Sequence, residues 1–322
     1  MDTGSHLLFG VTLAGLAYFN PAVGSDPHLA AAVMTVALVG SHAPDLDSVV
    51  RFKSNDAYLK HHRGLSHSIP AWFLWSGAIG TLASWGWGAW EHLLLLCIIA
   101  FSAVAAHVVF DLSNGYGVQC LLPFRKQWLH LDAVCLTDPF LLLLHTSTAI
   151  GSLIGIWPAP QWACAFAWGI TFVYMLWRVV HHEMVVRRVK RKYRRWRAVH
   201  VLPGLWWFRW QYVVQTDNGY EMGVIEGRRW LPSMLLPNRA THDCIDATKQ
   251  VSAVKTLHGF AKQEYASWAA QPDGGYLVIW TDLRFWRDRD WPYRAEVRLD
   301  DRYNVLTERI GWYKKAWEAP YV

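Results

Sequence analysis

The sequence lacks the cysteine patterns that hold many small domains and metal sites together. Its five cysteines are scattered among 322 residues, and no C-x-x-C pair occurs. This pattern predicts reduced thiols and excludes both a disulfide framework and a thiolate zinc site. The first residues, MDTGSHLLFG, also lack the basic segment that begins a secretory signal, so we expect no cleaved leader.

Basic residues are scarce in the first part of the chain. Residues 1–182 contain 7 Lys and Arg against 9 Asp and Glu, whereas residues 183–322 contain 24 against 16. Histidine is distributed the other way, with 12 of the 15 in the first part. We therefore predict one domain at 1–182 and a second at 200–322, joined by a basic linker at 183–199.

Long apolar stretches fill the first part, at about 7–24, 29–44, 69–90, 93–110, 140–157 and 161–177. Several reach the roughly 18 to 20 residues that a helix needs to cross about 30 Å of hydrocarbon. They predict a mainly α, membrane-embedded bundle of about six apolar helices. The alternative is a soluble helical bundle, because apolar helices can also form a buried core.

The positions of lysine and arginine favour the membrane. If the six stretches alternate in direction, one side receives all the basic residues of the first part, namely Arg51, Lys53, Lys60, Arg63, Arg125, Lys126 and Arg178. Such loops remain in the cytoplasm, so we expect a multispanning inner-membrane protein with this side cytoplasmic. The juxtamembrane run RRVKRKYRRWR, at 187–197, falls on the same side and is expected to bind anionic lipid headgroups.

Histidines and aspartates gather in the same predicted cytoplasmic layer. Its members are His6, His42, Asp45, Asp47, His61, His62, His67, His107, Asp111, His130, Asp132 and Asp138. Ionisable groups at the edge of an apolar bundle are costly unless they are paired or bind an ion. We therefore predict a functional site in this layer and interpret the remaining histidines of the apolar stretches as structural.

Two motifs in the layer have spacings suited to a metal ion. His107 and Asp111, in HVVFD, are four residues apart, so on a helix both side chains lie on one face. Asp45 and Asp47, in HAPDLDS, are two residues apart and project to one side of an extended turn. Two such carboxylates repel each other unless a cation lies between them.

The motif HHRGLSHS, at 61–68, adds two imidazoles and a cation. His62 and His67 lie on either side of Gly64, which permits a sharp chain reversal. Arg63 can present its planar guanidinium to a phosphate or a carboxylate. Each motif also occurs in ordinary helix pairs and solvated turns, so the predicted metal site depends on their common position in the layer.

Four motifs in order, MDTGSHLLFG, PDLD, HRGLSHS and HVVFD, followed by a stretch ending LLPF, resemble a family of membrane-bound metal-dependent hydrolases described as LexA-binding and inner-membrane-associated. The resemblance covers about residues 1–140. It implies a multispanning helical protein with a hydrolase site carried by His6, Asp45, Asp47, His62, His67, His107 and Asp111. Many members have His after PDLD where this chain has Ser48, and His42 is the candidate replacement for that ligand.

Residues 200–322 have the pattern of a soluble α+β domain. The segment WWFRWQYVVQTDNGYEMGVIEG predicts a hairpin around Asn218 and Gly219. YLVIWTDLRF and RAEVRLDDRYNVLTERI predict further strands, and a helix is expected between about 244 and 270. Basic and acidic residues alternate and no nucleic-acid motif occurs, so we expect a structural or regulatory cap with a protein partner, and no nucleic acid.

Two functions are consistent with these patterns. The preferred one is an integral-membrane hydrolase that uses one or two divalent ions on a phosphoester of a lipid or other amphiphilic substrate at the cytoplasmic leaflet. Nitrogen and oxygen ligands suit Zn²⁺, with Mn²⁺ or Fe²⁺ as alternatives. Arg63, helped by Arg125 or Lys126, is expected to stabilise phosphate charge, and Asp47 to accept a proton from water. The alternative is a non-catalytic scaffold or regulator with a structural metal site and a partner-binding C-terminal domain.

Overall fold

The computed structural model describes residues 1–322 apart from 53–56, 60–61, 232–233, 239–241, 288–289 and 314–322. Lys53, Lys60 and His61 therefore lie outside the described residues. The chain divides into two compact units. The first consists of 1–47, 63–185 and 202–209, and the second of 48–62, 186–201 and 210–322. The domain limits expected from composition stay a prediction.

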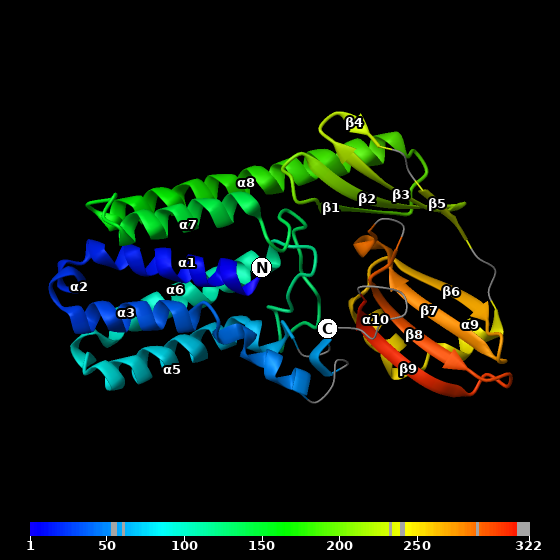
Figure 1. The fold of residues 1–322 in the computed structure, drawn as a ribbon, viewed down its shortest axis with the longest axis horizontal. Helices are drawn as coiled ribbons and strands as arrows, with labels where there is room; N and C mark the ends of the chain where they lie inside the picture. Colours follow the sequence, from blue (N-terminus) through cyan, green and yellow to red (C-terminus); the bar gives the residue numbers. More distant parts are fainter. Residues whose placement is uncertain (53–56, 60–61, 232–233, 239–241, 288–289, 314–322) are drawn as a thin grey trace. The chain divides into compact units, whose positions relative to one another are not determined.

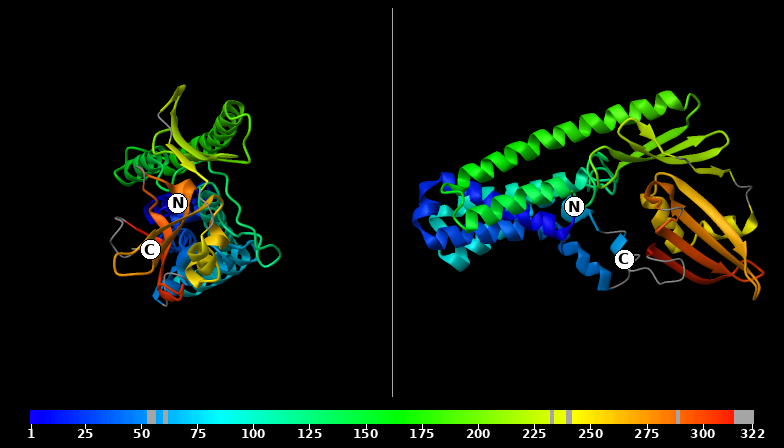
Figure 2. Two further views of the ribbon diagram at one scale, coloured as in Figure 1. Left: turned by 90° about the vertical axis from the view of Figure 1, so that its right-hand side faces the viewer. Right: turned by 45° about the horizontal axis from the view of Figure 1, so that its top comes forward.

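Helices make up the first unit (Figure 1). They are α1 (Thr3–Leu16), α2 (Pro21–Ser25), α3 (Pro27–Gly40), α5 (Ile69–Trp87), α6 (Leu93–Leu112), α7 (Pro139–Leu153) and α8 (Pro160–Lys192). Short 3-10 segments lie between them, at η1 (Ala17–Phe19), η2 (Ala43–Phe52), η3 (Leu65–His67) and η4 (Trp90–His92). Figure 2 shows α1, α3, α5 and α6 side by side from two further directions, and α8 continues as one helix into the second unit.

The starts of three helices follow from caps that the sequence supplies. Asp26, Ser68 and Asp138 each accept a hydrogen bond from a backbone N–H in the first turn of the helix that follows. A proline occupies one of the first two positions of each of these helices. A short polar cap satisfies an unpaired N–H, and proline suits a position whose N–H has no partner. The cap at Ser68 ends the HHRGLSHS motif and begins α5.

Two of the described helical segments are long and apolar enough to cross a membrane, Trp90–Leu112 and Pro160–Lys192. Pro27–Gly40 and Ala43–Val50, bent by 45°, make a third if they are counted as one span. The six membrane helices expected from the sequence are therefore not supported. Thr3–Phe19 and Pro139–Leu153 are shorter apolar helices, and the 15 residues of Pro139–Leu153 at ~1.5 Å each span only about 22 Å of a core of roughly 30 Å.

Close packing between α1, α3 and α6 determines where the chain runs after Gly40. A Cβ added at Gly40 would lie 3.0 Å from the carbonyl oxygen of Ala100 and 3.0 Å from the Cβ of Ala103. A Cβ added at Gly10 would lie 2.8 Å from the hydroxyl of Ser41. The two glycines thus let α3 approach both neighbours closely, and the chain just after Gly40 lies against α6.

Two antiparallel sheets and two helices make up most of the second unit. The first sheet contains β1 (Ala198–Pro203), β2 (Arg209–Thr216), β3 (Gly219–Glu226) and β4 (Arg229–Trp230) in that order, and β5 (Met234–Pro237) also pairs with β3. The second contains, in order, β6 (Glu264–Ala270), β7 (Tyr276–Asp282), β8 (Tyr293–Leu299) and β9 (Val305–Trp312). The helices are α9 (Asp243–Thr248) and α10 (Ser252–Phe260), and η5 (Leu283–Phe285) follows β7.

The predicted hairpin around Asn218 and Gly219 is confirmed as the pair β2 and β3. Gly219 has φ 137°, and a Cβ there would lie 2.1 Å from the carbonyl oxygen of Leu236, so the turn requires glycine. The helix expected between about 244 and 270 is found as α10, and the end of that range, from Glu264 to Ala270, forms β6, which pairs with β7. Its alanines have little strand propensity, but pairing across the sheet overrides local propensity.

Candidate metal centre

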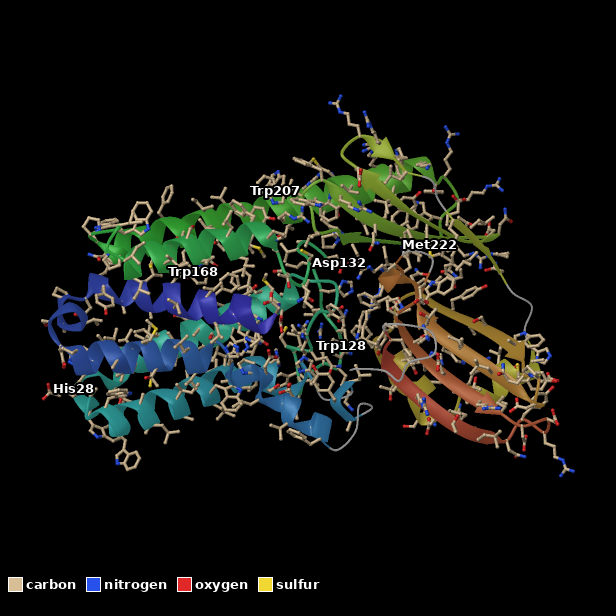
Figure 3. The ribbon with its side chains drawn as sticks, in the orientation of Figure 1. His28, Trp128, Asp132, Trp168, Trp207 and Met222 are labelled. Atoms are coloured by element: carbon tan, nitrogen blue, oxygen red, sulfur yellow. The ribbon has the colours of Figure 1, made fainter. Side chains whose placement is uncertain are left out.

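Four side chains from three segments of the first unit meet at one end of the helices. Asp45 comes from η2, His67 from η3, and His107 and Asp111 from the last turns of α6. One ligand atom from each residue lies within 4.8 Å of the other three. We call these residues the four-ligand group. Figure 3 labels Asp132 near this end of the helices and His28 at the opposite end.

Five of the six distances among four ligand atoms of this group are 3.3 to 3.6 Å, close to the edges of a tetrahedral site. His107 Nε2 lies 3.3 Å from His67 Nε2, and both nitrogens lie 3.5 Å from Asp45 Oδ1. Asp111 Oδ2 lies 3.5 Å from His67 Nε2 and 3.6 Å from His107 Nε2. A tetrahedron with edges of about 3.5 Å has a centre about 2.1 Å from each corner, the usual Zn–N and Zn–O distance in proteins. The donor set therefore fits a small divalent ion.

Two carboxylate oxygens in this group lack hydrogen-bond donors among the described residues. They are Asp45 Oδ1 and Asp111 Oδ2, and both atoms are buried. The imidazole nitrogens nearest to them, at 3.5 to 3.6 Å, are too far for good hydrogen bonds. A buried carboxylate oxygen without a donor is costly, and a cation at the centre of the group would remove that cost.

Hydrogen bonds orient both imidazoles toward the centre. His107 Nδ1 lies 2.7 Å from the carbonyl oxygen of Ser41, so Nδ1 carries the proton and Nε2 keeps its lone pair. His67 Nδ1 lies 2.9 Å from the hydroxyl oxygen of Ser66, which donates to Asp47 Oδ2 at 2.5 Å. Asp47 Oδ2 is itself 3.5 Å from His67 Nδ1. Such partners fix the tautomer and ring orientation of metal-binding histidines.

Arg63 binds the second oxygen of Asp111. Its Nη2 lies 3.1 Å from Asp111 Oδ1, its Nη1 donates to Asn114 Oδ1 at 3.1 Å, and its backbone N–H donates to Asp47. The residue is only 7% exposed, and its φ of 61° is uncommon for a residue other than glycine. Arg63 thus fixes the orientation of Asp111 and leaves Oδ2 directed into the four-ligand group.

His67 is surrounded by three carboxylates. Burial by itself lowers the pKa of its imidazole, but the interactions with the carboxylates of Asp111, Asp45 and Asp47 outweigh burial and raise the pKa to about 10. The imidazole therefore holds a second proton at neutral pH when no cation is bound. A metal ion that takes Nε2 must displace this proton, as is usual for histidine ligands.

Two further predicted histidines lie beside the four-ligand group. The His6 ring stacks on His107 with centroids 3.8 Å apart, and its Nε2 lies 3.4 Å from Asp111 Oδ1. The terminal amino group of Met1 contacts Asp111 and lies 3.0 Å from His6 Nε2. His42 meets the edge of His6, with centroids 6.5 Å apart. Direct ligation by His6, His42 or Asp47 stays a prediction.

Three further predicted residues are not members of the four-ligand group. His62 belongs to the second unit, where its ring stacks on Tyr58 with centroids 4.5 Å apart. Arg125 and Lys126 are exposed on the loop that follows α6. A role for His62 as a ligand, and for the two basic residues at a phosphate, stays a prediction.

The remaining described members of the predicted layer have local structural partners. His130 Nδ1 lies 2.9 Å from Asp132 Oδ1. Asp138 accepts two backbone N–H bonds at the start of α7 and a third bond from the hydroxyl of Tyr174 at 2.8 Å. The three bonds to Asp138 account for the burial of its carboxylate without an ion.

Sequence reasoning did not identify Ser41, Ser66 and Asn114 as parts of the site. Asn114 follows Asp111 by three residues, and this helical spacing is a signal that could have found it. Ser66 precedes His67 directly and was visible only as part of the motif. Ser41 acts through its backbone carbonyl, which leaves no trace in the sequence.

The fold and the site define a protein whose first unit is helical, with two candidate membrane spans among the described residues and a candidate metal centre. Residues 1–185 match the family described as YdjM inner membrane protein, which is more than half of the chain, and the chain belongs to this family. Residues 243–317 match the YfhP C-terminal alpha/beta plait domain, the region of α9, α10 and β6–β9.

A relative along almost the full length occurs in Bacillus subtilis (strain 168). It is described as uncharacterized protein YfhP and is 31% identical over 327 residues, which cover 97% of this chain and 95% of that protein. No solved structure matches the chain. The membrane-associated part of the resemblance drawn from the motifs is confirmed. Hydrolase activity, LexA binding, a multispanning topology and the cytoplasmic orientation stay predictions.

Proposed function

We propose that this protein is a metal-dependent hydrolase of a phosphoester in a lipid or other amphiphilic substrate at the cytoplasmic leaflet. The observation that carries the proposal is the four-ligand group, whose atoms lie within 4.8 Å of one another and whose two inward carboxylate oxygens lack hydrogen-bond donors among the described residues. Nitrogen and oxygen donors suit Zn²⁺, with Mn²⁺ or Fe²⁺ as alternatives. A divalent ion held there would lower the pKa of a bound water toward about 7 and so supply hydroxide.

Exposure indicates the direction from which a substrate would arrive. The side chain of Asp45 is 24% exposed, whereas those of His67, His107 and Asp111 are buried. Solvent and substrate would therefore reach the group past Asp45. Membership of an inner-membrane family and the two candidate spans support a substrate that is itself part of the bilayer.

Arg63 and Asp47 have separate roles in this scheme. Arg63 is first a positioning residue, because it holds Asp111 and Asn114, and its positive charge also favours a phosphoryl group near the four-ligand group. Asp47 is the proposed proton acceptor. Its carboxylate accepts hydrogen bonds from the hydroxyl of Ser66 and the backbone N–H of Arg63, which hold it beside His67.

The test is a hydrolysis assay on the purified full chain, stripped of metal and reloaded separately with Zn²⁺, Mn²⁺ or Fe²⁺. A panel of phosphoesters should include a glycerophospholipid in vesicles and a water-soluble phosphodiester. We expect activity that depends on metal and is lost in His67→Ala. His258→Ala is the matched control, because His258 pairs with Glu264 in the second unit. A metal-loaded chain that hydrolyses none of the panel would contradict the proposal.

A structural metal site is the second candidate function, and one observation favours it. Four protein ligands already complete a tetrahedron, whereas catalytic zinc sites usually keep one position for water. Cobalt substitution separates the two candidates. A four-coordinate visible spectrum that inorganic phosphate leaves unchanged indicates a scaffold, and a spectrum that phosphate alters indicates an open position.

The basic run at 187–197 is proposed to bind anionic lipid headgroups. Part of it has protein partners, since Arg188 donates to the backbone carbonyls of Gly227 and Arg228, and Lys192 lies 4.0 Å from the ring centroid of Trp230. Arg194 and Arg195 are exposed and supply the charge for headgroups. For the C-terminal domain we propose a protein partner and a structural or regulatory role.

The proposed orientation can be tested with reporter fusions. Fusions after residues 60 and 197 should report the cytoplasm, because the basic residues of the first part and the basic run are expected there. Fusions near 25, 90 and 160 should report the opposite side. A fusion after residue 60 or after residue 197 that reports the outer side would show that the histidines and aspartates of the predicted layer do not all lie on the cytoplasmic side.

A further inference from the structure

An apolar loop joins β1 to β2. The segment Leu205–Trp206–Trp207–Phe208 exposes large side chains, with 54% of Leu205, 68% of Trp206 and 54% of Phe208 accessible. Exposed apolar residues that stand singly are ordinary, but a contiguous group of this kind marks an interaction surface. We call residues 205–208 the aromatic loop. It is assigned to the first unit, although most of the two strands that it joins belongs to the second.

Buried contacts with α8 and α7 hold the loop in place. Arg178 of α8 is 1% exposed and donates from Nη1 to the carbonyl oxygen of Trp207 at 2.6 Å and from Nε to that of Ala133 at 2.7 Å. The ring of Trp207 meets Phe140 of α7 with centroids 5.3 Å apart. Figure 3 shows Trp207 beside α8. The loop is thus fixed to a helix that is itself a candidate membrane span.

The contact lies where α8 would leave the hydrocarbon. From Pro160 to Trp177 the helix carries no charged side chain, and at ~1.5 Å per residue this segment is about 26 Å long, close to a core of roughly 30 Å. Trp177 and Arg178 stand at the C-terminal end of this segment and contact the aromatic loop. The ring centroids of Trp177 and Phe208 are 6.1 Å apart. After Arg178, the next Lys or Arg of α8 is Arg187.

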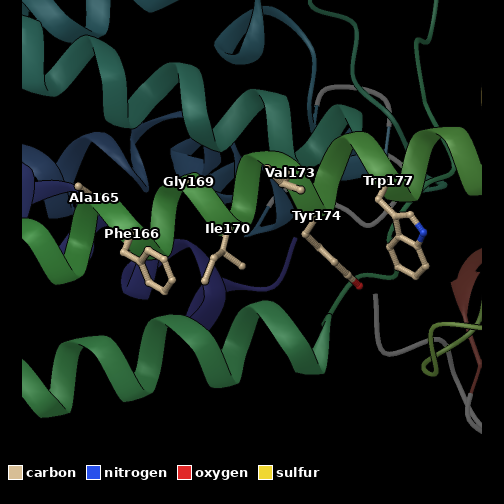
Figure 4. Close-up of a pocket in the computed structure, with 7 residues that line it drawn as sticks. All are labelled: Ala165, Phe166, Gly169, Ile170, Val173, Tyr174 and Trp177. Carbon is tan, nitrogen blue, oxygen red and sulfur yellow. The ribbon is translucent and has the colours of Figure 1, made fainter.

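The apolar surface continues from the loop along α8. A groove on this helix is lined by Phe166, Ile170, Val173, Tyr174 and Trp177 (Figure 4). Tyr174 and Trp177 also contact the loop, with ring centroids 6.2 Å from Trp207 in both cases. The apolar face of α8 and the loop are therefore parts of one continuous apolar region.

We propose that the aromatic loop inserts into the membrane interface beside the end of α8 and anchors the β1–β2 pair to the bilayer surface. The occupant of this surface is lipid, because the loop continues the apolar face of a candidate span and because tryptophan concentrates at the boundary between hydrocarbon and headgroups. The inference rests on α8 crossing the bilayer and is independent of hydrolase activity.

Site-specific photo-crosslinking tests the proposal. The full chain, reconstituted in vesicles of phosphatidylglycerol and phosphatidylethanolamine, carries p-benzoyl-phenylalanine in place of Trp206 or, in a second protein, of Phe208. Leu235 on β5 is the matched control, because it is 56% exposed on the second unit. After irradiation, mass spectrometry distinguishes adducts with phospholipid from adducts with protein.

The expected result is a phospholipid adduct at Trp206 and Phe208, in at least tenfold excess over the adduct at Leu235. A covalent dimer at these positions would show that a second copy covers the loop and would overturn the proposal. The absence of phospholipid adducts at both loop positions, or equal yields at Leu235, would also overturn it.

Discussion

Each unit buries an arginine against an aspartate. The two pairs differ in whether both carboxylate oxygens of the aspartate accept hydrogen bonds. In the second unit Arg284 binds both oxygens of Asp282, at 2.7 to 3.2 Å, and one of these oxygens also accepts the backbone N–H of Lys262. In the first unit Arg63 binds only Oδ1 of Asp111, and Oδ2 has no hydrogen-bond donor among the described residues.

The comparison shows that buried charge by itself does not mark a site. The pair of Arg284 and Asp282 is closed and explains its own burial, because each charged group has its hydrogen bonds within the fold. The pair of Arg63 and Asp111 leaves an acceptor directed at two imidazoles and a second such carboxylate. An unsatisfied acceptor among other ligand atoms is what separates a candidate metal centre from a structural ion pair.

The largest expected effect is on metal binding by Asp111→Asn. The amide keeps the shape of the side chain but removes the negative charge from one of four ligands, so the metal affinity should fall by more than the roughly 10- to 100-fold typical of lost outer partners. Metal content after equilibration with a competing chelator measures this. The control variant Asp282→Asn should bind as much metal as the unchanged chain. If Asp111→Asn binds as much metal as Asp282→Asn, the two arginine–aspartate pairs do not differ as we infer.

The matching substitution in the second unit should lower the folding stability and leave metal binding unchanged. Asp282→Ala leaves Arg284 buried without a counter-charge, which should cost about 3 to 5 kcal/mol of folding free energy. Hydrogen exchange of the β7 and β8 amides in the full chain would report it. Asp273→Ala is the control, because its partner Arg298 and Asp273 itself are exposed and such pairs contribute at most about 1 kcal/mol. Equal effects would mean that the buried pair is no stronger than the exposed one.

A smaller effect is expected from Ser66→Ala. The hydroxyl connects His67 Nδ1 to Asp47, so its loss frees the imidazole to rotate and should lower the metal affinity by about 10- to 100-fold. The same chelator competition measures the change. Ser147→Ala removes an exposed hydroxyl that bonds only within α7 among its described contacts, and it should change nothing. Unchanged affinity in Ser66→Ala would remove Ser66 from the site.

Arg63→Lys should have the smallest effect on metal. Lysine keeps a positive charge near Asp111 but loses the planar group that contacts Asp111 and Asn114 together, so metal affinity should change by less than about 10-fold. Turnover of any phosphoester should fall more than metal content does. If this variant loses metal as completely as Asp111→Asn, the orientation of Asp111 depends on the arginine fork and not on its charge.

Several features of the fold could be predicted because they depend on neighbours in sequence. The hairpin at Asn218 and Gly219 requires a turn residue, and Gly219 is the residue that supplies it. The apolar stretches all became helices, but their number as membrane spans was overestimated. Helix length decides whether a segment can cross a bilayer. The apolar pattern did not reveal that α1 ends at Leu16 and α7 at Leu153.

In the candidate site, too, contacts between neighbours in sequence could be predicted, whereas contacts between distant segments could not. The sequence by itself determined that His107 and Asp111 share a helix face, because a spacing of four residues is one turn. Only the tertiary structure decided that Asp45 and His67 join them while His62 stacks on Tyr58 in the second unit. It also decided that Ser41 and Asn114 complete the surroundings. These contacts join residues up to 66 positions apart and depend on how closely helices pack at Gly10 and Gly40, which no local pattern specifies.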